Sequence, residues 1–346
     1  MKRHIICTLI FAFFLLTVPA IPVKLASAQL STEENVDNVE NFVDSVPEES
    51  SRQTESAEKT DVSAEFYKVL DVSTGQVIDV SVLDYVTGAV CAEMPATFEK
   101  EALKAQAVAA HTYAERQKMR ELENPDPELC GAYFSNDTSK YQGYFTENQA
   151  KQYYGENYDI YFPKVKEAAS EVIDYMLTYE DEPIISAFHS MSSGTTESAE
   201  NAWGAPVAYL IPVDSGYDTS APKYFEESSY QKDILREKLT AAFPQANLGE
   251  DASGWIKVTS VSESGTVLAA DVGGITVSGA DIRTALALRS ASFEVKSAGD
   301  NIIFATKGYG HGVGMSQYGA NSMAAAGSSW QDILTHYYPG CSIDEV

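Results

Sequence analysis

One glutamate lies where its carboxyl group could act as a general acid. Glu93 falls in the sequence CAEMP (residues 91–95), between the end of an apolar helical stretch and a turn that Pro95 fixes. Burial among apolar groups disfavours the charged carboxylate, so its pKa rises and a proton stays available near neutral pH. An ordinary helix-terminus charge or surface residue is the alternative, and this segment alone does not decide between them.

A second segment is rich in small hydroxylated residues. Residues 188–197 read FHSMSSGTTE, and Trp203 follows shortly after. Such hydroxyl groups suit sugar recognition, although an ordinary Ser/Thr turn has the same composition. The chain has no G-x-S-x-G motif and no evident His–acid pair, which argues against a serine hydrolase. The candidate substrate-binding residues of this segment are His189, Ser190, Ser192, Ser193 and Trp203.

A third segment places glycines at alternate positions around a histidine. Residues 308–320 read GYGHGVGMSQYGA, a pattern that predicts positive φ angles or close approach of the backbone to another group. The spacing does not fit a nucleotide-binding loop, and the histidines of the chain show no H-E-x-x-H pairing, so we predict neither a catalytic metal nor a cofactor. This segment adds four candidate substrate-binding residues: His311, Ser316, Gln317 and Tyr318.

These segments, in this order, resemble the stage II sporulation protein D family, whose wider relatives include amidase-enhancer proteins (the SpoIID/LytB domain). The resemblance is close at residues 84–95, 101–113 and 310–320, weaker at 278–290 and 337–340, and spans about residues 65–342. It implies a lytic transglycosylase that cleaves peptidoglycan glycan strands already stripped of stem peptides by a partner amidase. The best-known role of the family is remodelling of the septal wall during engulfment of the forespore, and related domains also occur outside sporulation.

The resemblance implies that Glu93 is the catalytic acid. It would protonate the oxygen of the MurNAc–GlcNAc bond and then take the proton of the muramoyl C6 hydroxyl as that oxygen closes onto C1, which leaves a 1,6-anhydromuramoyl end. Ordinary glycosidases need two carboxylates. The 50 acidic residues of the chain leave a second catalytic carboxylate open. The competing hypotheses are a non-catalytic wall-binding module that enhances an amidase and, less favoured, a metal-dependent hydrolase.

The chain departs from the zinc-binding motif of some members of this family. Those members carry a sequence that resembles Cys-x-x-x-x-His-Cys-Gln-x-Tyr, and the corresponding residues 135–144 here read SNDTSKYQGY. Neither cysteine nor the histidine is present, so we predict no zinc at this place.

The expected elements are those that must position the three segments. Helices are predicted over residues 82–92, 98–120 (N-cap Thr97) and 279–288 (N-cap Ser278), and a C-terminal helix is predicted to open with a capping box of Ser328 and Gln331. A hairpin over residues 66–72 and 76–80 and strands over 184–188 and 266–272 complete the pattern. Without regular βαβ alternation, the prediction is an α+β fold around one catalytic groove, with an inserted subdomain over residues 214–300.

The N-terminus predicts export. Lys2 and Arg3 precede an apolar run over residues 5–23 and the small-residue site Ala26-Ser27-Ala28, so residues 1–28 read as a signal peptide, with an uncleaved membrane tether as the alternative. Residues 29–63 have the composition of a disordered acidic linker, and residues 64–346 form the predicted catalytic domain. We therefore expect an extracytoplasmic protein, secreted or anchored at the cell envelope.

Charge and cysteine content restrict the partners. The chain has a net charge of -26, and removal of Lys2, Arg3 and Lys24 with the signal would leave 21 basic and 50 acidic residues, or -29. Binding of nucleic acid needs a basic surface, so nucleic acid is excluded as an expected partner. Cys91, Cys130 and Cys341 would remain, which fits either buried free thiols or one disulfide and one thiol.

Overall fold

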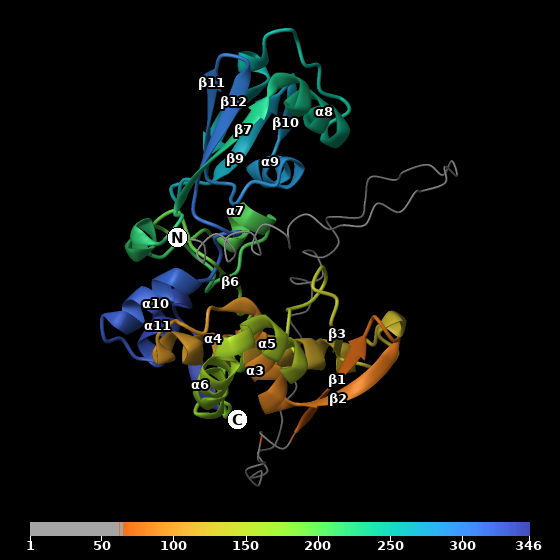
Figure 1. Ribbon diagram of the computed structural model, residues 1–346, viewed down its shortest axis with the longest axis vertical. Helices are drawn as coiled ribbons and strands as arrows, with labels where there is room; N and C mark the ends of the chain where they lie inside the picture. Colours follow the sequence, from red (N-terminus) through yellow and green to blue (C-terminus); the bar gives the residue numbers. More distant parts are fainter. Residues whose placement is uncertain (1–61, 63–64) are drawn as a thin grey trace. The chain divides into compact units, whose positions relative to one another are not determined.

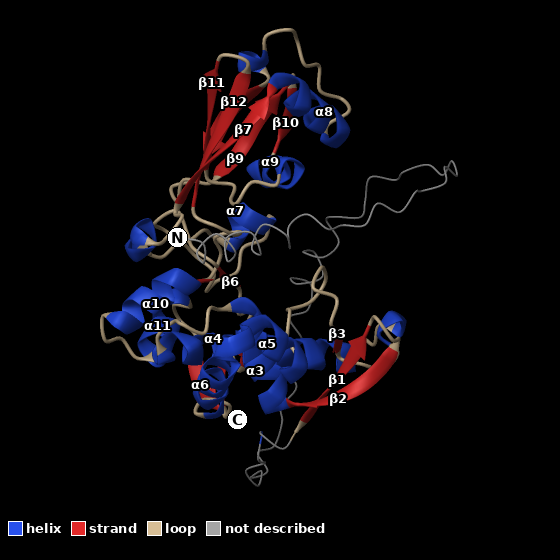
Figure 2. Cartoon of the chain, in the orientation of Figure 1, coloured by secondary structure: helices blue, strands red, loops and turns tan. Residues whose placement is uncertain are grey.

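The computed structural model describes Val62 and residues 65–346, and the α+β prediction is confirmed there. In this part of the chain, helices are mixed with five small sheets of two or three strands each, and there is no single large sheet (Figure 2). The predicted signal or tether and nearly all of the predicted linker lie outside the described residues. Within the described part, no helix is both long and apolar enough to cross a membrane.

The predicted hairpin is confirmed. Strand β1 (Phe66–Asp71) pairs antiparallel with β2 (Gln76–Ser81), and the short β3 (Phe134–Ser135) joins β1 in parallel. Gly75 takes a positive φ of 70° in the turn, a conformation that glycine adopts without steric cost. The hairpin leads directly into the helix that carries Glu93.

Helices α3 (Val82–Glu93) and α4 (Lys100–Glu123) form the centre of the first hydrophobic core (Figure 1). The start predicted for α4 is wrong, because the helix begins at Lys100 with Glu99 as N-cap. Phe98 instead closes a turn, in which its backbone N–H donates to the Pro95 carbonyl oxygen (3.0 Å). Four alanines of α4 are buried, which lets its neighbours approach closely: Ala102, Ala105, Ala109 and Ala110. These neighbours include α6 (Tyr158–Ser170), β4 (Tyr175–Tyr179), α10 (Gln317–Ala325) and α11 (Trp330–Tyr337).

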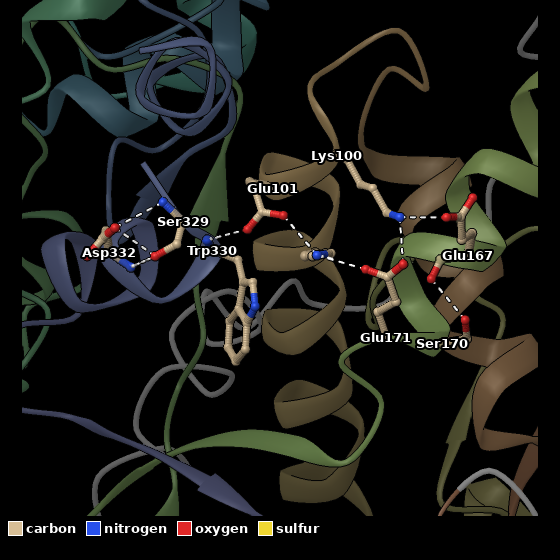
Figure 3. A network of polar contacts seen from close by, with 9 residues as sticks. Lys100, Glu101, Glu167, Ser170, Glu171, Ser329, Trp330 and Asp332 are labelled. Carbon is tan, nitrogen blue, oxygen red and sulfur yellow. Dashed lines mark hydrogen bonds and ion pairs between the residues drawn. The ribbon is translucent and has the colours of Figure 1, made fainter. Parts of the chain in front are cut away.

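A polar network fixes the beginning of α4 (Figure 3). The Lys100 ammonium group donates to Glu167 on α6 (2.6 Å) and to Glu171, the C-cap of that helix (2.5 Å). The Glu101 carboxylate accepts the backbone N–H of Trp330 (2.9 Å), the first residue of α11. These bonds tie three helices together at the N-terminal end of α4, next to the turn that follows α3.

Two predictions near the C-terminal half need correction. The capping box of α11 consists of Ser329 and Asp332, one residue later than predicted. The predicted strand over residues 184–188 is wrong for most of its length. Only Phe188–His189 (β6) is a strand, and it pairs in parallel with β13 (Met315–Ser316). The strands nearby are β5 (Glu182–Pro183) and β14 (Ser342–Glu345), which flank β4.

A second hydrophobic core forms within residues 225–307, the part of the chain that runs from strand β7 to strand β12. This part overlaps the predicted insertion over residues 214–300. Two three-stranded antiparallel sheets, β10-β9-β8 and β11-β12-β7, carry this core together with α8 and α9. Ser278 caps α9 as predicted, and the helix ends at Leu286, two residues early, where Ala287 turns into the left-handed conformation. The bounds are β7 Phe225–Gln231, α8 Lys232–Ala242, β8 Ile256–Val261, β9 Val267–Val272, β10 Ile275–Val277, α9 Gly279–Leu286, β11 Phe293–Ala298 and β12 Asn301–Lys307.

Candidate active site

Glu93 is the last residue of α3, and its side chain is half-buried. Burial raises the pKa of its carboxyl group above the usual value, and a hydrogen bond from the backbone N–H of Gly143 opposes that rise. The carboxyl group also lies at the negative end of a helix, which disfavours its anion. The surroundings of Glu93 therefore let its carboxyl group keep a proton at a higher pH than an exposed glutamate does, as the sequence predicts.

A loop passes over α3 and supplies that N–H. The backbone N–H of Phe145 donates to the Gly88 carbonyl oxygen (3.0 Å), and a Cβ on Gly88 would lie only 2.1 Å from the Phe145 oxygen. A Cβ on Gly143 would lie 3.3 Å from Glu93 Oε1. The glycine that weakens the helix pattern of α3 is thus the place where the loop docks. Reasoning from sequence did not identify Gly143, although it lies in the segment that matches the zinc motif of other members.

Several buried polar groups near Glu93 have no hydrogen-bonding partner among the described residues. They include the Tyr85 hydroxyl group and both polar atoms of the Gln142 side chain. The charge of Glu93 helps to raise the pKa of Tyr85, after the larger effect of burial. The Gln142 backbone N–H donates to the Tyr113 hydroxyl oxygen (3.2 Å). Burial raises the pKa of Tyr113, and the charge of Glu93 adds to that rise. Buried polar groups are nearly always paired, so these atoms mark a place prepared for a polar ligand or water.

Gln317 connects the third segment to the first. It is the first residue of α10, it is buried, and its Nε2 donates to the Glu93 main-chain oxygen (3.0 Å) and to Gln106 Oε1 (3.3 Å). The structure therefore places its amide group against the backbone of Glu93. Its assignment to sugar binding stays a prediction.

The alternating glycines explain how the second and third segments meet. Gly308, Gly310, Gly312 and Gly314 all have positive φ angles, as the pattern predicts. A Cβ on Gly314 would lie 2.0 Å from the Ala187 oxygen, and Cβ atoms on the other three would lie 2.7 to 3.3 Å from atoms of residues 189–197. Only glycine allows the two backbones to run this close together over the whole stretch.

Buried Asp218 gathers the hydroxyl groups of these segments. Its Oδ2 accepts from the Ser192 N–H (2.7 Å), the Ser192 hydroxyl (2.6 Å) and the Ser215 hydroxyl (2.9 Å), and its Oδ1 accepts from the Ser316 hydroxyl (2.7 Å). Burial raises the pKa of Asp218, and these four donors oppose it. Ser193 donates to the Ser264 carbonyl oxygen. Three of the predicted sugar-binding hydroxyl groups thus have partners within the protein, and sequence reasoning did not identify Asp218.

The rings of His189 and His311 pack at a tilt of 59°, with centroids 5.7 Å apart, and the half-buried Trp203 packs on His311 at 5.6 Å. Trp203 ends α7 (Ala199–Trp203). His189 Nδ1 bonds to the Val313 oxygen (3.1 Å), while its Nε2 is buried without a partner among the described residues. Burial lowers the pKa of His189 to about 4 and that of His311 to about 3, so both rings are neutral at pH 7. They can donate or accept one hydrogen bond but cannot supply a positive charge.

Ser190 and Tyr318 lie on the partly exposed side of this arrangement. The Ser190 carbonyl oxygen accepts the Tyr318 N–H (3.0 Å), and the Tyr318 ring packs edge-on against Phe98, with centroids 5.0 Å apart. Among the described residues, no group of three or more histidine, cysteine or acidic side chains is arranged to hold a metal ion. The three described cysteines are free thiols, and Cys130 is exposed rather than buried.

Comparison with known proteins identifies the family of the chain. Residues 71–179 match the family model described as "Stage II sporulation protein". The chain is 35% identical to stage II sporulation protein D of Bacillus subtilis (strain 168), over 100% of this chain and 97% of that protein. It is 38% identical to the protein of the same name from Bacillus amyloliquefaciens, over 85% and 83%. An amidase enhancer of Bacillus subtilis is 27% identical over 74% of this chain and 40% of its own length. The chain belongs to the stage II sporulation protein D family.

Proposed function

We propose that this protein is a lytic transglycosylase of the cell envelope that cleaves the MurNAc–GlcNAc bond of peptide-stripped glycan strands. The observation that supports the proposal is the half-buried Glu93 carboxyl group, with its raised pKa, at the end of α3. The Gly143 N–H stabilises the ionised form of this carboxyl group, so the group can hold a proton and also release it. One residue that does both can serve as acid and then as base.

In the proposed reaction, protonated Glu93 donates its proton to the glycosidic oxygen as the bond to C1 breaks. The carboxylate then takes the proton of the C6 hydroxyl group while that oxygen bonds to C1, which regenerates the acid and leaves a 1,6-anhydromuramoyl end. Proton transfer of this kind contributes roughly 10²–10⁴-fold. The remaining rate enhancement must come from placing the C6 hydroxyl correctly and from polar groups that stabilise the oxocarbenium-like state. The unpartnered Tyr85 hydroxyl and Gln142 amide are the nearest candidates for that work.

The test is mass spectrometry of the products from peptide-free glycan strands. The wild-type chain is expected to yield anhydro ends, Glu93→Gln none, and Glu237→Gln, an exposed position on α8, the same products as wild type. Reducing ends that incorporate solvent oxygen would contradict the proposal and indicate a muramidase. Activity retained by Glu93→Gln would remove Glu93 from the reaction.

A second candidate function is a non-catalytic enhancer of a cell-wall amidase, which the name of one relative favours. It predicts glycan binding and stimulation of an amidase that both survive Glu93→Gln, with no anhydro product from the wild-type chain. The same samples, assayed with and without an amidase, separate the two functions. Both candidate functions require a protein outside the cytoplasm that binds peptidoglycan and acts together with an amidase.

A further inference from the structure

A groove of about 430 Å³ begins beside the turn over residues 94–99, between α3 and α4. We call this turn the catalytic turn, because it follows the proposed acid Glu93. Three segments line the groove: the turn that follows α3, the short helix η4 (Gly216–Ser220) with the residues after it, and the first part of α10. Its volume falls in the range of small-ligand sites, about 300–1,000 Å³. Pro95, two residues after Glu93, is part of its wall, so the groove borders the turn that follows the end of α3, where Glu93 lies.

The lining combines aromatic rings with uncharged polar groups. Tyr217 is 55% exposed, and the Tyr318 ring packs edge-on against Phe98, which also lines the groove. Thr97 and Asn321 contribute hydroxyl and amide groups, and none of the described residues that line the groove is charged. Sugar rings have apolar faces that stack on aromatic side chains and polar edges that need hydrogen bonds. The groove offers both, whereas a phosphate-bearing ligand would find no cation in it.

Hydrogen bonds hold the three walls in fixed positions. Gln317 bonds to the Glu93 oxygen (3.0 Å), and Asn321 Oδ1 accepts the Glu99 N–H (2.7 Å), so α10 is attached twice to the catalytic turn. The Ser316 hydroxyl, which caps α10, donates to Asp218 of η4 (2.7 Å). A site that is already ordered before binding loses less conformational freedom when the ligand arrives.

Lys164 secures the catalytic turn from the side of α6. Its ammonium group donates to the main-chain oxygens of Ala96 (2.9 Å) and Phe98 (2.5 Å). Together with the Pro95 carbonyl group, which accepts the Phe98 N–H, three backbone carbonyl groups of this turn have partners within the protein. Thr97 and Pro95, which are exposed on this turn, are presented to the groove by a rigid backbone.

We infer that this groove binds the sugar rings of the glycan strand on one side of the bond that Glu93 would cleave, with Tyr217 and Tyr318 as stacking platforms. The inference rests on the proposed function for the identity of the strand. It assigns to Tyr217 a role in substrate affinity that none of the three sequence segments indicates. Tyr217 touches the ligand but takes no part in proton transfer.

The experiment measures binding and cleavage separately. Binding of a peptide-free hexasaccharide of alternating GlcNAc and MurNAc is titrated calorimetrically into the full chain carrying Glu93→Gln, with and without Tyr217→Ala. The expected result is a Kd about tenfold higher for the double variant, as loss of one aromatic stacking partner predicts. Tyr217→Phe should retain the affinity, and Phe225→Ala, an equally exposed aromatic outside the groove, should leave it unchanged.

Cleavage by the otherwise wild-type chain distinguishes failure of the groove from failure of the proposed function. Tyr217→Ala should raise KM about tenfold with little change in kcat. If wild type yields anhydro ends and Tyr217→Ala alters neither Kd nor KM, the groove assignment is wrong and the proposed function stands. If wild type cleaves nothing but Tyr217→Ala still weakens glycan binding, the groove is right and the transglycosylase is wrong. Loss of amidase binding by Tyr217→Ala with glycan affinity unchanged would overturn the inference in favour of a protein partner.

Discussion

Gln317 Nε2 lies 3.0 Å from the main-chain oxygen of Glu93, across 224 residues of sequence. The last carbonyl groups of a helix have no donor within it, and Glu93 ends α3, so the amide of Gln317 supplies the missing partner. Gln106 on α4 accepts a second bond from the same nitrogen (3.3 Å) and fixes the orientation of the amide. The two most distinctive motifs of the chain therefore meet at the backbone of Glu93, the proposed acid.

This contact predicts that Gln317 positions Glu93. Gln317→Met keeps the length of the side chain but removes the donor, so the end of α3 loses its anchor and the carboxyl group loses its fixed place. We expect kcat to fall roughly 10- to 100-fold, because small displacements of a reacting group are costly. KM should change little. Steady-state kinetics on peptide-free glycan measure both quantities.

Gln331→Met, at an exposed position of α11, is the matched control and should behave as wild type. A Gln317→Met enzyme with unchanged kcat and raised KM would show that the side chain contacts the sugar, as the sequence pattern alone suggests. Circular dichroism of both variants shows whether either substitution has disrupted the fold.

The second prediction concerns pH. The pKa of Glu93 is raised by burial, so the folded protein holds this proton more tightly than the unfolded chain does. Its contribution to stability is therefore complete below the ordinary carboxyl pKa of 4.5 and is lost as the pH rises through the folded pKa. Glu93→Gln cannot ionise, so it should be at least as stable as wild type at pH 8, and the advantage should disappear below pH 4.5. Thermal unfolding at both pH values measures the difference.

The same proton limits the activity. The reaction starts from protonated Glu93, so kcat/KM should decline as the pH rises through a value above 4.5. A decline centred below 4.5, or a Glu93→Gln variant clearly less stable than wild type at pH 8, would contradict a buried proton donor at this position.

The sequence predicts much of this site because local chemistry determines it. The glycines at 308, 310, 312 and 314 lie where φ is positive, and Pro95 lies where α3 has ended. The boundary of α4 is predicted wrongly, because the Phe98 N–H bonds back to Pro95 in a turn and the ring packs against the distant Tyr318. Asp218 is one of many acidic residues, and only the folded chain brings the serines to it. Long-range contacts of this kind leave no periodic signal.

Gly88→Ala is the third prediction. An exposed alanine would stabilise a helix relative to glycine by about 1 kcal/mol. At this position the added Cβ would overlap the Phe145 carbonyl oxygen at 2.1 Å, a backbone atom that cannot move away cheaply. We expect a net loss of about 1–3 kcal/mol in the free energy of unfolding. Activity should fall as well, since the loop that brings the Gly143 N–H to Glu93 is displaced.

Gly249→Ala provides the control, because nothing lies within 4 Å of a Cβ at that glycine. Chemical denaturation gives the free energies of both variants. A Gly88→Ala chain that is more stable than wild type would show that the loop does not depend on close contact with α3.

The fourth prediction concerns acid stability. Hydrogen bonds from Lys100 and Lys104 lower the pKa of Glu171 to about 2 (Figure 3 shows the Lys100 bond). A lowered carboxyl pKa means that the stabilisation is complete above the ordinary value of 4.5 and is lost as the pH falls through about 2. Glu171→Gln should therefore lower the unfolding temperature at pH 7, and the difference should shrink between pH 4.5 and pH 2. The pair is exposed, so the effect should be small and should weaken further in 1 M salt, where the screening length is about 3 Å. A difference that stays constant from pH 7 to pH 2 would mean that Glu171 acts through packing, and the network at the start of α4 would then not be electrostatic.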